Sequence, residues 1–247
     1  MFFTGHKRHS VLMSMQTLIR NKRTLKHVAD TTRSWRSAED GVNTTLECFD
    51  FIVDALEKLA AESTDTVTMS SAEGLLTRLR TFQFIVSLHL LKLVFKTTGP
   101  ASRILQSIAA DVAVSTQVVA NAISVLQQYR ADSVATWNKL TTDDTEFAVL
   151  HDVEAQLPAT RLRCVPRQSG EQASDERITD PKERFRIEVF NIVLDAVIAQ
   201  MTDQFAPDKM PLIVQTQYFT PWKLMTDDDV PPESMKELCN FYGLDLL

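Results

Sequence analysis

Turn-forming residues are scarce in this chain, which holds 6 glycines and 9 prolines among 247 residues. A β-sandwich or β-barrel built from many short strands needs more turns than so few of these residues provide. The scarcity therefore argues against an all-β fold. Hydrophobic residues make up 44% of the chain and charged residues 23%, a balance that allows a buried core and excludes a disordered chain.

Cysteine and long apolar runs are also rare. The three cysteines lie far apart, at Cys48, Cys164 and Cys239. An odd and sparse set is typical of free thiols in a reducing compartment. No stretch reaches the roughly 18 apolar residues of a membrane helix, because even Phe82–Phe95 is interrupted by His89. We therefore expect an intracellular protein, nuclear or cytoplasmic, with no membrane partner.

The short motifs of common catalytic and metal sites are missing. The sequence has no Cys-x-x-Cys or His-Glu-x-x-His for zinc, no Gly-x-Ser-x-Gly elbow for a nucleophile and no Gly-rich phosphate loop. The carboxylates of Asp227–Asp229 lack the glycine spacing of a calcium loop, so we interpret them as the acidic start of a helix. We predict no metal, no cofactor and no catalytic residue, and we do not expect an enzyme.

Positive charge is concentrated near the N-terminus. The chain carries a net charge of -6, yet residues 1–40 hold eight Lys or Arg against three acidic residues, which gives +5. A basic segment on an acidic body is able to contact a polyanion, whereas the alternative is an ordinary solvated helix face. The candidate phosphate contacts are Arg20, Lys22, Arg23, Lys26, Arg33 and Arg36.

Apolar spacings of three and four predict a mainly α fold, a bundle of about six helices. The expected helices are Val42–Ala61, a helix from Ser70 or Ser71 to Phe95, Ile104–Lys139, Phe147–Leu157 and Pro181 to about Phe205, followed by a strand or helix at Leu212–Tyr218 and a short helix from Pro231 to Gly243. In the helix that begins at Pro181 we expect Phe185, Val189, Ile192, Val193, Ala196, Val197 and Met201 to face inward.

Composition divides the chain into four parts. They are a basic segment at residues 1–40, a helical region at 41–157, a polar linker at 158–180, and a long helix with a C-terminal helical segment at 181–247. The linker has little to bury, so we expect it to be mobile and sensitive to proteases. The long helix should begin after Asp180, because an Asp cap followed by Pro is a typical helix start.

Five landmarks occur in order along the chain. They are the Arg- and Trp-containing stretch Asp30–Glu39, a leader helix at Phe51–Ala61 with the gap Glu62–Asp65, Gly74-Leu75-Leu76 running into Phe82-Gln83-Phe84, Phe185-Arg186-Ile187-Glu188-Val189-Phe190, and Leu238-Cys239-Asn240-Phe241-Tyr242-Gly243. With these landmarks the chain, from roughly residue 10 to residue 247, resembles the hAT superfamily of DNA transposases. The resemblance is to the zinc-finger MYM-type-like proteins and to the THAP-type repressor of the inhibitor of the protein kinase.

The resemblance implies that the chain is mostly the helical insertion that interrupts an RNase H-like transposase core. In that family the catalytic aspartates lie upstream of the Arg-Trp stretch, and the catalytic glutamate and the dimerisation segment lie downstream of the Phe-Tyr-Gly sequence. The resemblance therefore implies a domesticated, catalytically inactive nuclear protein, an interaction module with weak, non-specific affinity for DNA and a tendency to self-associate. The alternative is a plain protein-interaction bundle without DNA contact.

Trp35 completes the candidate nucleic-acid site. In the resembling transposases an Arg-Trp pair lies beside the active site, where the Trp stacks on a base taken out of the duplex. Here Ser34 separates Arg33 from Trp35, and Arg36 follows. The alternative interpretation is a half-buried Trp at a helix N-terminus with Arg on its rim.

Overall fold

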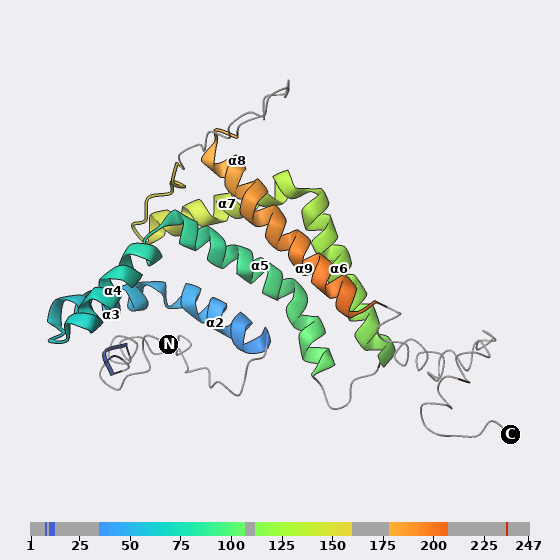
Figure 1. Ribbon diagram of the computed structural model, residues 1–247, viewed down its shortest axis with the longest axis horizontal. Coiled ribbons are helices and arrows are strands. Elements are labelled where there is room, and N and C mark those ends of the chain that lie inside the picture. The colour runs from blue at the N-terminus through green and yellow to red at the C-terminus, as the bar shows by residue number, and fades with distance from the viewer. Residues whose placement is uncertain are drawn as a thin grey trace, which may run out of the picture. The chain divides into compact units, whose positions relative to one another are not determined.

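The structure is a computed structural model, and it describes residues 35–106, 112–159 and 178–206 together with residues 8, 10–12 and 236. Every regular element in these ranges is helical, so the chain is mainly α, as the sequence predicts. The helices are α2 (Trp35–Glu47), α3 (Phe49–Glu62), α4 (Thr66–Leu79), α5 (Phe82–Leu105), α6 (Val112–Ala131), α7 (Ser133–Leu150), α8 (Pro181–Phe185), the π-helical turn η2 (Arg186–Asn191) and α9 (Ile192–Gln204) (Figure 1).

The described helices fall into two compact units. One unit holds the described residues up to Lys96 together with Asp132–Ile192, and the other holds Thr97–Ala131 together with the described residues from Val193 onward. Each unit therefore joins stretches that are distant in the sequence. Helix α5 contributes its first part to one unit and its last part to the other.

The first unit buries an apolar core between α3, α4, α5, α7 and the α8–η2 segment. Its fully enclosed side chains include Leu56, Phe82, Ile85, Val86 and Phe190. Helices α3 and α4 pack as a hairpin, because only residues 63–65 connect them. In the second unit Leu126 of α6 and Leu194 of α9 are completely buried, and the exposed ion pair between Arg130 Nε and Asp195 Oδ1, at 2.8 Å, joins the same two helices.

Several helices are shorter than the sequence predicts. The expected helix Val42–Ala61 is broken at the buried Cys48. The expected helix from Ser70 or Ser71 to Phe95 is two helices, α4 and α5. Asp65 caps α4, because its carboxylate accepts hydrogen bonds from the amides of Val67 and Thr68, so α4 starts before the predicted serines. Thr81 separates the two helices and caps α5, since its Oγ1 accepts from the amide of Phe84 at 3.2 Å.

Helix α5 is longer than predicted. The sequence favours an end at Thr97–Pro100, but the helix continues through Pro100 to Leu105. Proline removes the hydrogen bond to the carbonyl four residues earlier, here that of Lys96. Pro100 and Lys96 are both exposed, so water is able to satisfy this carbonyl.

The end of α7 also differs from the prediction. A helix was expected over Phe147–Leu157, but α7 ends at Leu150. The amide of Val153 donates to the carbonyl of Ala148 at 2.8 Å, and the amide of Asp152 donates to that of Val149 at 3.4 Å. Asp152 has a left-handed φ of 55°. This is a Schellman motif, which satisfies the last carbonyls of the helix and turns the chain away.

The long helix begins at Pro181, as predicted, and the carboxylate of Asp180 accepts from the amides of Lys182 and Glu183. Its predicted inward face is only partly correct. The buried apolar residues are Phe185, Phe190 and Leu194, whereas Ile192 is 58% exposed. The π-turn η2 explains the difference, because its hydrogen bonds span five residues and one extra residue rotates everything that follows.

Other predictions concern residues outside the described ranges. These are residues 160–177 of the linker, the strand or helix at Leu212–Tyr218, and the last short helix, of which only Lys236 is described, as helical.

Candidate functional site

The described part of the chain does not test the predicted nucleic-acid site. Arg20, Lys22, Arg23, Lys26 and Arg33 lie outside it. The backbone of Trp35 and Arg36 forms the first turn of α2, but their side chains are not described. The basic site therefore stays a prediction from the sequence.

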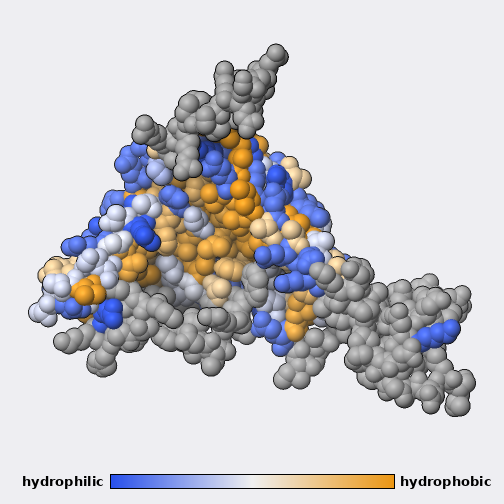
Figure 2. Space-filling view, in the orientation of Figure 1, coloured by the Kyte–Doolittle hydropathy of each residue, from blue (hydrophilic) through white to orange (hydrophobic). Residues whose placement is uncertain are grey.

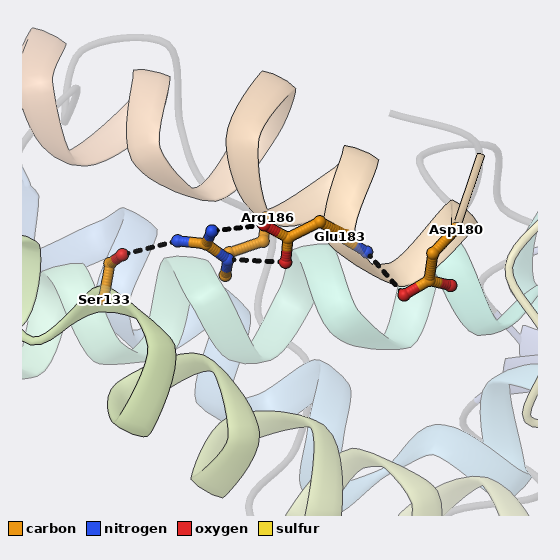
Figure 3. A network of polar contacts seen from close by, with 4 residues as sticks. All are labelled: Ser133, Asp180, Glu183 and Arg186. Atoms are coloured by element: carbon orange, nitrogen blue, oxygen red, sulfur yellow. Dashed lines mark hydrogen bonds and ion pairs between the residues drawn. The ribbon is translucent and has the colours of Figure 1, made fainter. Parts of the chain in front are cut away.

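The α8–η2 segment carries the first notable group of side chains. The guanidinium of Arg186 donates to both carboxylate oxygens of Glu183, at 2.9 Å and 2.5 Å, and its Nη1 donates to Oγ of Ser133 on α7 at 2.7 Å (Figure 3). The hydrogen bond from Arg186 lowers the pKa of the Glu183 carboxyl, and the same contact raises the pKa of the guanidinium. Arg186 thus ties the π-turn to α7.

An aromatic group lies beneath the same turn. The ring of Trp137 stacks on Phe185 at a centroid distance of 5.7 Å and an interplanar angle of 22°, and it also lies 5.7 Å from Phe190. All three side chains are buried. Asn191 closes the π-turn, and its buried Oδ1 has no hydrogen-bond partner among the described residues. π-turns frequently occur at functional sites, so this segment is a candidate.

The outer side of the π-turn is apolar. Ile187 is 36% exposed and Ile192 is 58% exposed. They are five residues apart, which is the repeat of the π-turn's hydrogen bonds, so they lie on one side of the helix. Figure 2 shows apolar side chains gathered on the visible face over the α8–η2 segment. A helix held rigidly on its inner side therefore presents isoleucines on its outer side.

A second group of side chains lies where α7 meets α3 and α5. The Nδ1 atom of His89 on α5 lies 2.5 Å from Oδ1 of Asp144 on α7. His151, directly after α7, pairs through Nδ1 with Oδ1 of Asp50 on α3. Phe147 lies between the pairs, with its ring 5.1 Å from that of His89 and 4.2 Å from that of His151. We call these five residues the Asp-His cluster.

Burial dominates the electrostatics of this cluster. The side chain of Asp144 is 0% exposed and that of His89 is 13% exposed. Neither carboxylate oxygen of Asp144 makes a hydrogen bond of normal geometry with any described group, so the close approach of His89 is its only compensation. Burial raises the pKa of Asp144, against the opposing hydrogen bond and charge of His89, and the neighbouring carboxylate of Asp143 raises it further.

The sequence analysis does not predict this cluster, because it treats His89 only as an interruption of the apolar run Phe82–Phe95. A signal does exist on α7, because Asp144, Phe147 and His151 are spaced by three and four residues and so line one face. Their partners are on other helices, and no local pattern indicates them.

Among the described residues there is neither a group of metal-binding side chains nor a membrane-spanning helix. Within residues 35–106, 112–159 and 178–206, no three His, Cys, Asp or Glu side chains gather as they would around a metal ion. No helix in the same ranges is long and apolar enough to cross a membrane. The fold and these two groups of side chains define a mainly α-helical protein with an apolar helix edge and a buried acid-base cluster.

The chain was compared with known protein families, with curated proteins and with solved structures, and none of them matched. The resemblance to the hAT transposases accordingly rests on the order of the five sequence landmarks alone.

Proposed function

We propose that this chain is a non-catalytic helical module that associates through the outer side of the π-turn. The observation that carries the proposal is the exposure of Ile187 and Ile192 on a helix whose inner side is fixed. Arg186 ties that inner side to Ser133, and Trp137 stacks against it. A helix that is already fixed by its inner side loses little backbone entropy when its outer side binds.

Burial of the exposed parts of the two isoleucines favours association. Fully burying one isoleucine is worth about 1.5–3 kcal/mol, and Ile192 is 58% exposed. In a symmetric pair each copy contributes the same side chains, so the gain counts twice. We therefore take a second copy of this chain as the first partner to test.

The experiment compares association of the wild-type chain with that of an Ile187→Glu, Ile192→Glu double variant, by light scattering over a range of concentrations. We expect the wild type to associate at tens of micromolar and the variant to stay monomeric. Val67→Glu is the matched control, because Val67 is 71% exposed but lies on α4. A wild-type chain that is monomeric throughout, or a control that is as monomeric as the variant, would refute the proposal.

A transposase origin supports the choice of this face. The landmark Phe185–Phe190 resembles a Tyr/Phe-Arg-x-x-Val-Phe helix of the hAT superfamily. Three of its residues have structural roles here, because Phe185 and Phe190 contact Trp137 and Arg186 bonds to Ser133. In the complete transposases such a helix packs on the RNase H-like part. We propose that this chain derives from a hAT transposase, is not an enzyme, and uses the same face for association.

Nucleic-acid contact through residues 1–40 is the second candidate function, and it would place the protein in the nucleus. The charge of +5, eight basic residues against three acidic, supports it. Binding to duplex DNA should weaken steeply with salt, by a slope of about -0.9 per phosphate contact in log affinity against log salt. Replacing Arg20, Lys22, Arg23 and Lys26 with Ala should flatten that slope, whereas salt-independent binding by the wild type would exclude the candidate.

Trp35 is tested separately with single-stranded DNA. If its ring stacks on a base, Trp35→Ala should weaken single-strand binding by about 1–3 kcal/mol and leave duplex binding unchanged. An unchanged single-strand affinity would assign Trp35 to packing.

A further inference from the structure

The Asp-His cluster connects α3, α5 and α7 through two Asp–His pairs, and the side that provides the aspartate is reversed between the two pairs. Helix α7 supplies the acid of one pair, Asp144, and the residue that ends α7 supplies the base of the other, His151. Their partners are His89 on α5 and Asp50 on α3. Both of these Asp–His contacts depend on a proton.

Phe147 joins the two pairs into one packed group. Its ring meets that of His89 edge to face, with an interplanar angle of 85°, and it lies 5.5 Å from the ring of Phe49 on α3. Phe49 also lies 5.0 Å from the ring of His151. Aromatic rings at these distances and angles attract one another, so a displacement of either imidazole disturbs the packing of the other.

The pair of Asp144 and His89 is enclosed, whereas the pair of His151 and Asp50 is exposed to solvent on the side of Asp50. Asp144 is 0% exposed, and its only close polar neighbour in the described chain is His89. An ionised carboxylate in such a place is costly unless a cation or a proton compensates it. In the second pair the side chain of His151 is 9% exposed and that of Asp50 is 59% exposed, so the imidazole is enclosed and its carboxylate partner meets water.

Other charged groups on the same elements lie toward solvent. They include Glu47 on α2, Asp54, Glu57 and Glu62 on α3, Lys92 and Lys96 on α5, Lys139, Asp143 and Glu146 on α7, and Asp152 after α7, all exposed, together with the half-buried Lys58 on α3. Asp143 is the group among them that acts on Asp144. The enclosed centre thus contains one acid and two imidazoles.

We propose that the Asp-His cluster is a proton-controlled clamp that holds α7 against α3 and α5, tight when the enclosed pair holds a proton and loosened when that proton is lost at higher pH. When each pair holds one proton, both carboxylates are compensated. When that proton is lost, Asp144 is a buried anion beside a neutral ring.

The raised pKa of Asp144 predicts the same direction for the pH dependence of stability. Burial raises its pKa, so the folded chain holds a proton that the unfolded chain releases near pH 3.9. The stabilisation that comes with this proton is complete below the unfolded pKa and is lost as the pH rises through the folded pKa. The cluster therefore favours the folded state more at lower pH.

The test measures the unfolding equilibrium constant of the full chain by urea denaturation at intervals from about pH 4.5 to about pH 8.5, a range that begins above the unfolded pKa of an aspartate. For each proton held by the folded state and not by the unfolded state, this constant rises by up to about tenfold per pH unit. We expect the unfolding equilibrium constant of the wild type to rise with pH. The rise should be much smaller in the Asp50→Asn, Asp144→Asn variant, because asparagine keeps the shape of the side chain and removes the titrating acid.

The matched control is Asp195→Asn. It also removes a carboxylate from an ion pair, that with Arg130, but the pair lies on the surface of the other unit. Its pH dependence should equal that of the wild type. A wild-type constant that does not change with pH would overturn the clamp, and so would a double variant that keeps the wild-type dependence.

A second measurement needs no variant. Hydrogen exchange of the wild-type chain, corrected for the intrinsic effect of pH, reports the opening of each helix. The protection of amides in α7 should fall over the same pH range more than that of amides in α6. Equal changes in both helices would contradict the proposal, even if the double variant does not fold.

Discussion

The tie between Arg186 and Ser133 is open to a quantitative test. Arg186 donates to two partners that differ in burial. Ser133 is 7% exposed, whereas the side chain of Glu183 is 43% exposed. A buried donor left without its acceptor costs about 1–3 kcal/mol. An exposed pair three residues apart on a helix contributes about 0.2–0.5 kcal/mol. We therefore predict that the single hydrogen bond to Ser133 is worth more than the two to Glu183.

The assay is a pair of double-mutant cycles followed by urea denaturation. One cycle uses Ser133→Ala and Arg186→Met, and the other uses Glu183→Ala and the same Arg186 variant, in which Met keeps most of the buried stem. We expect a coupling energy of about 1–3 kcal/mol in the first cycle and about 0.5 kcal/mol or less in the second. Added salt should reduce only the coupling energy between Arg186 and Glu183. A coupling with Glu183 that equals or exceeds that with Ser133 would show that burial does not set these energies.

Four further outcomes are expected. Asp152→Gly should stabilise the chain by up to about 1 kcal/mol in thermal unfolding and Asp152→Val should destabilise it, because Asp152 has a φ of 55°. Asp65→Ala should lower the melting temperature at neutral pH, because it removes the helix cap. The hydrogen bond from Thr68 lowers the pKa of Asp65, so the cap stabilises the fold above the unfolded pKa of about 3.9, and this stabilisation is lost as the pH falls through the folded pKa. The melting temperatures of the wild type and the variant should therefore converge at low pH. Phe190→Ala should cost about 3–5 kcal/mol in urea denaturation, since Phe190 is completely buried against Trp137, and a cost below about 1 kcal/mol would contradict that packing. Limited trypsin should cut first within Pro158–Asp180, because its composition is polar, and a first cut inside Leu75–Phe95 would show that the linker is misplaced.

Helix starts were predictable where the signal is local. Asp180 and Pro181 specify a helix start by themselves, one through its carboxylate and the other through its fixed φ, and the helix begins there. The end of α7 was not predictable in the same way. Val153 and Leu157 are buried and four residues apart, which fits a helix, but they lie in extended chain, where every second residue also faces one side. A spacing of four residues therefore does not distinguish a helix from extended chain.

The Asp-His cluster depends on tertiary contacts. Asp50 and His151 are 101 residues apart, so no local pattern links them. The sequence places Asp144, Phe147 and His151 on one helix face, yet only the packing of α3 and α5 supplies Phe49 and the partner side chains. Composition, charge and periodicity therefore predict the helices of this chain but not the pairs of side chains between them.

The π-turn makes the length of one helix as important as its composition. Upstream of η2 the buried position is Phe185, and downstream it is Leu194, with Phe190 between them at steps of five and four residues. Deleting a single residue between Phe185 and Phe190 would restore a regular α-helix in which Phe185, Phe190 and Leu194 follow one another at steps of four and stay on one face. Substitutions that turn η2 into a regular helix without removing a residue would instead rotate α9 by about 100° relative to its present position, and Leu194 would leave its core. The π-turn therefore makes this helix tolerant of the loss of one residue, where a regular helix would lose its register.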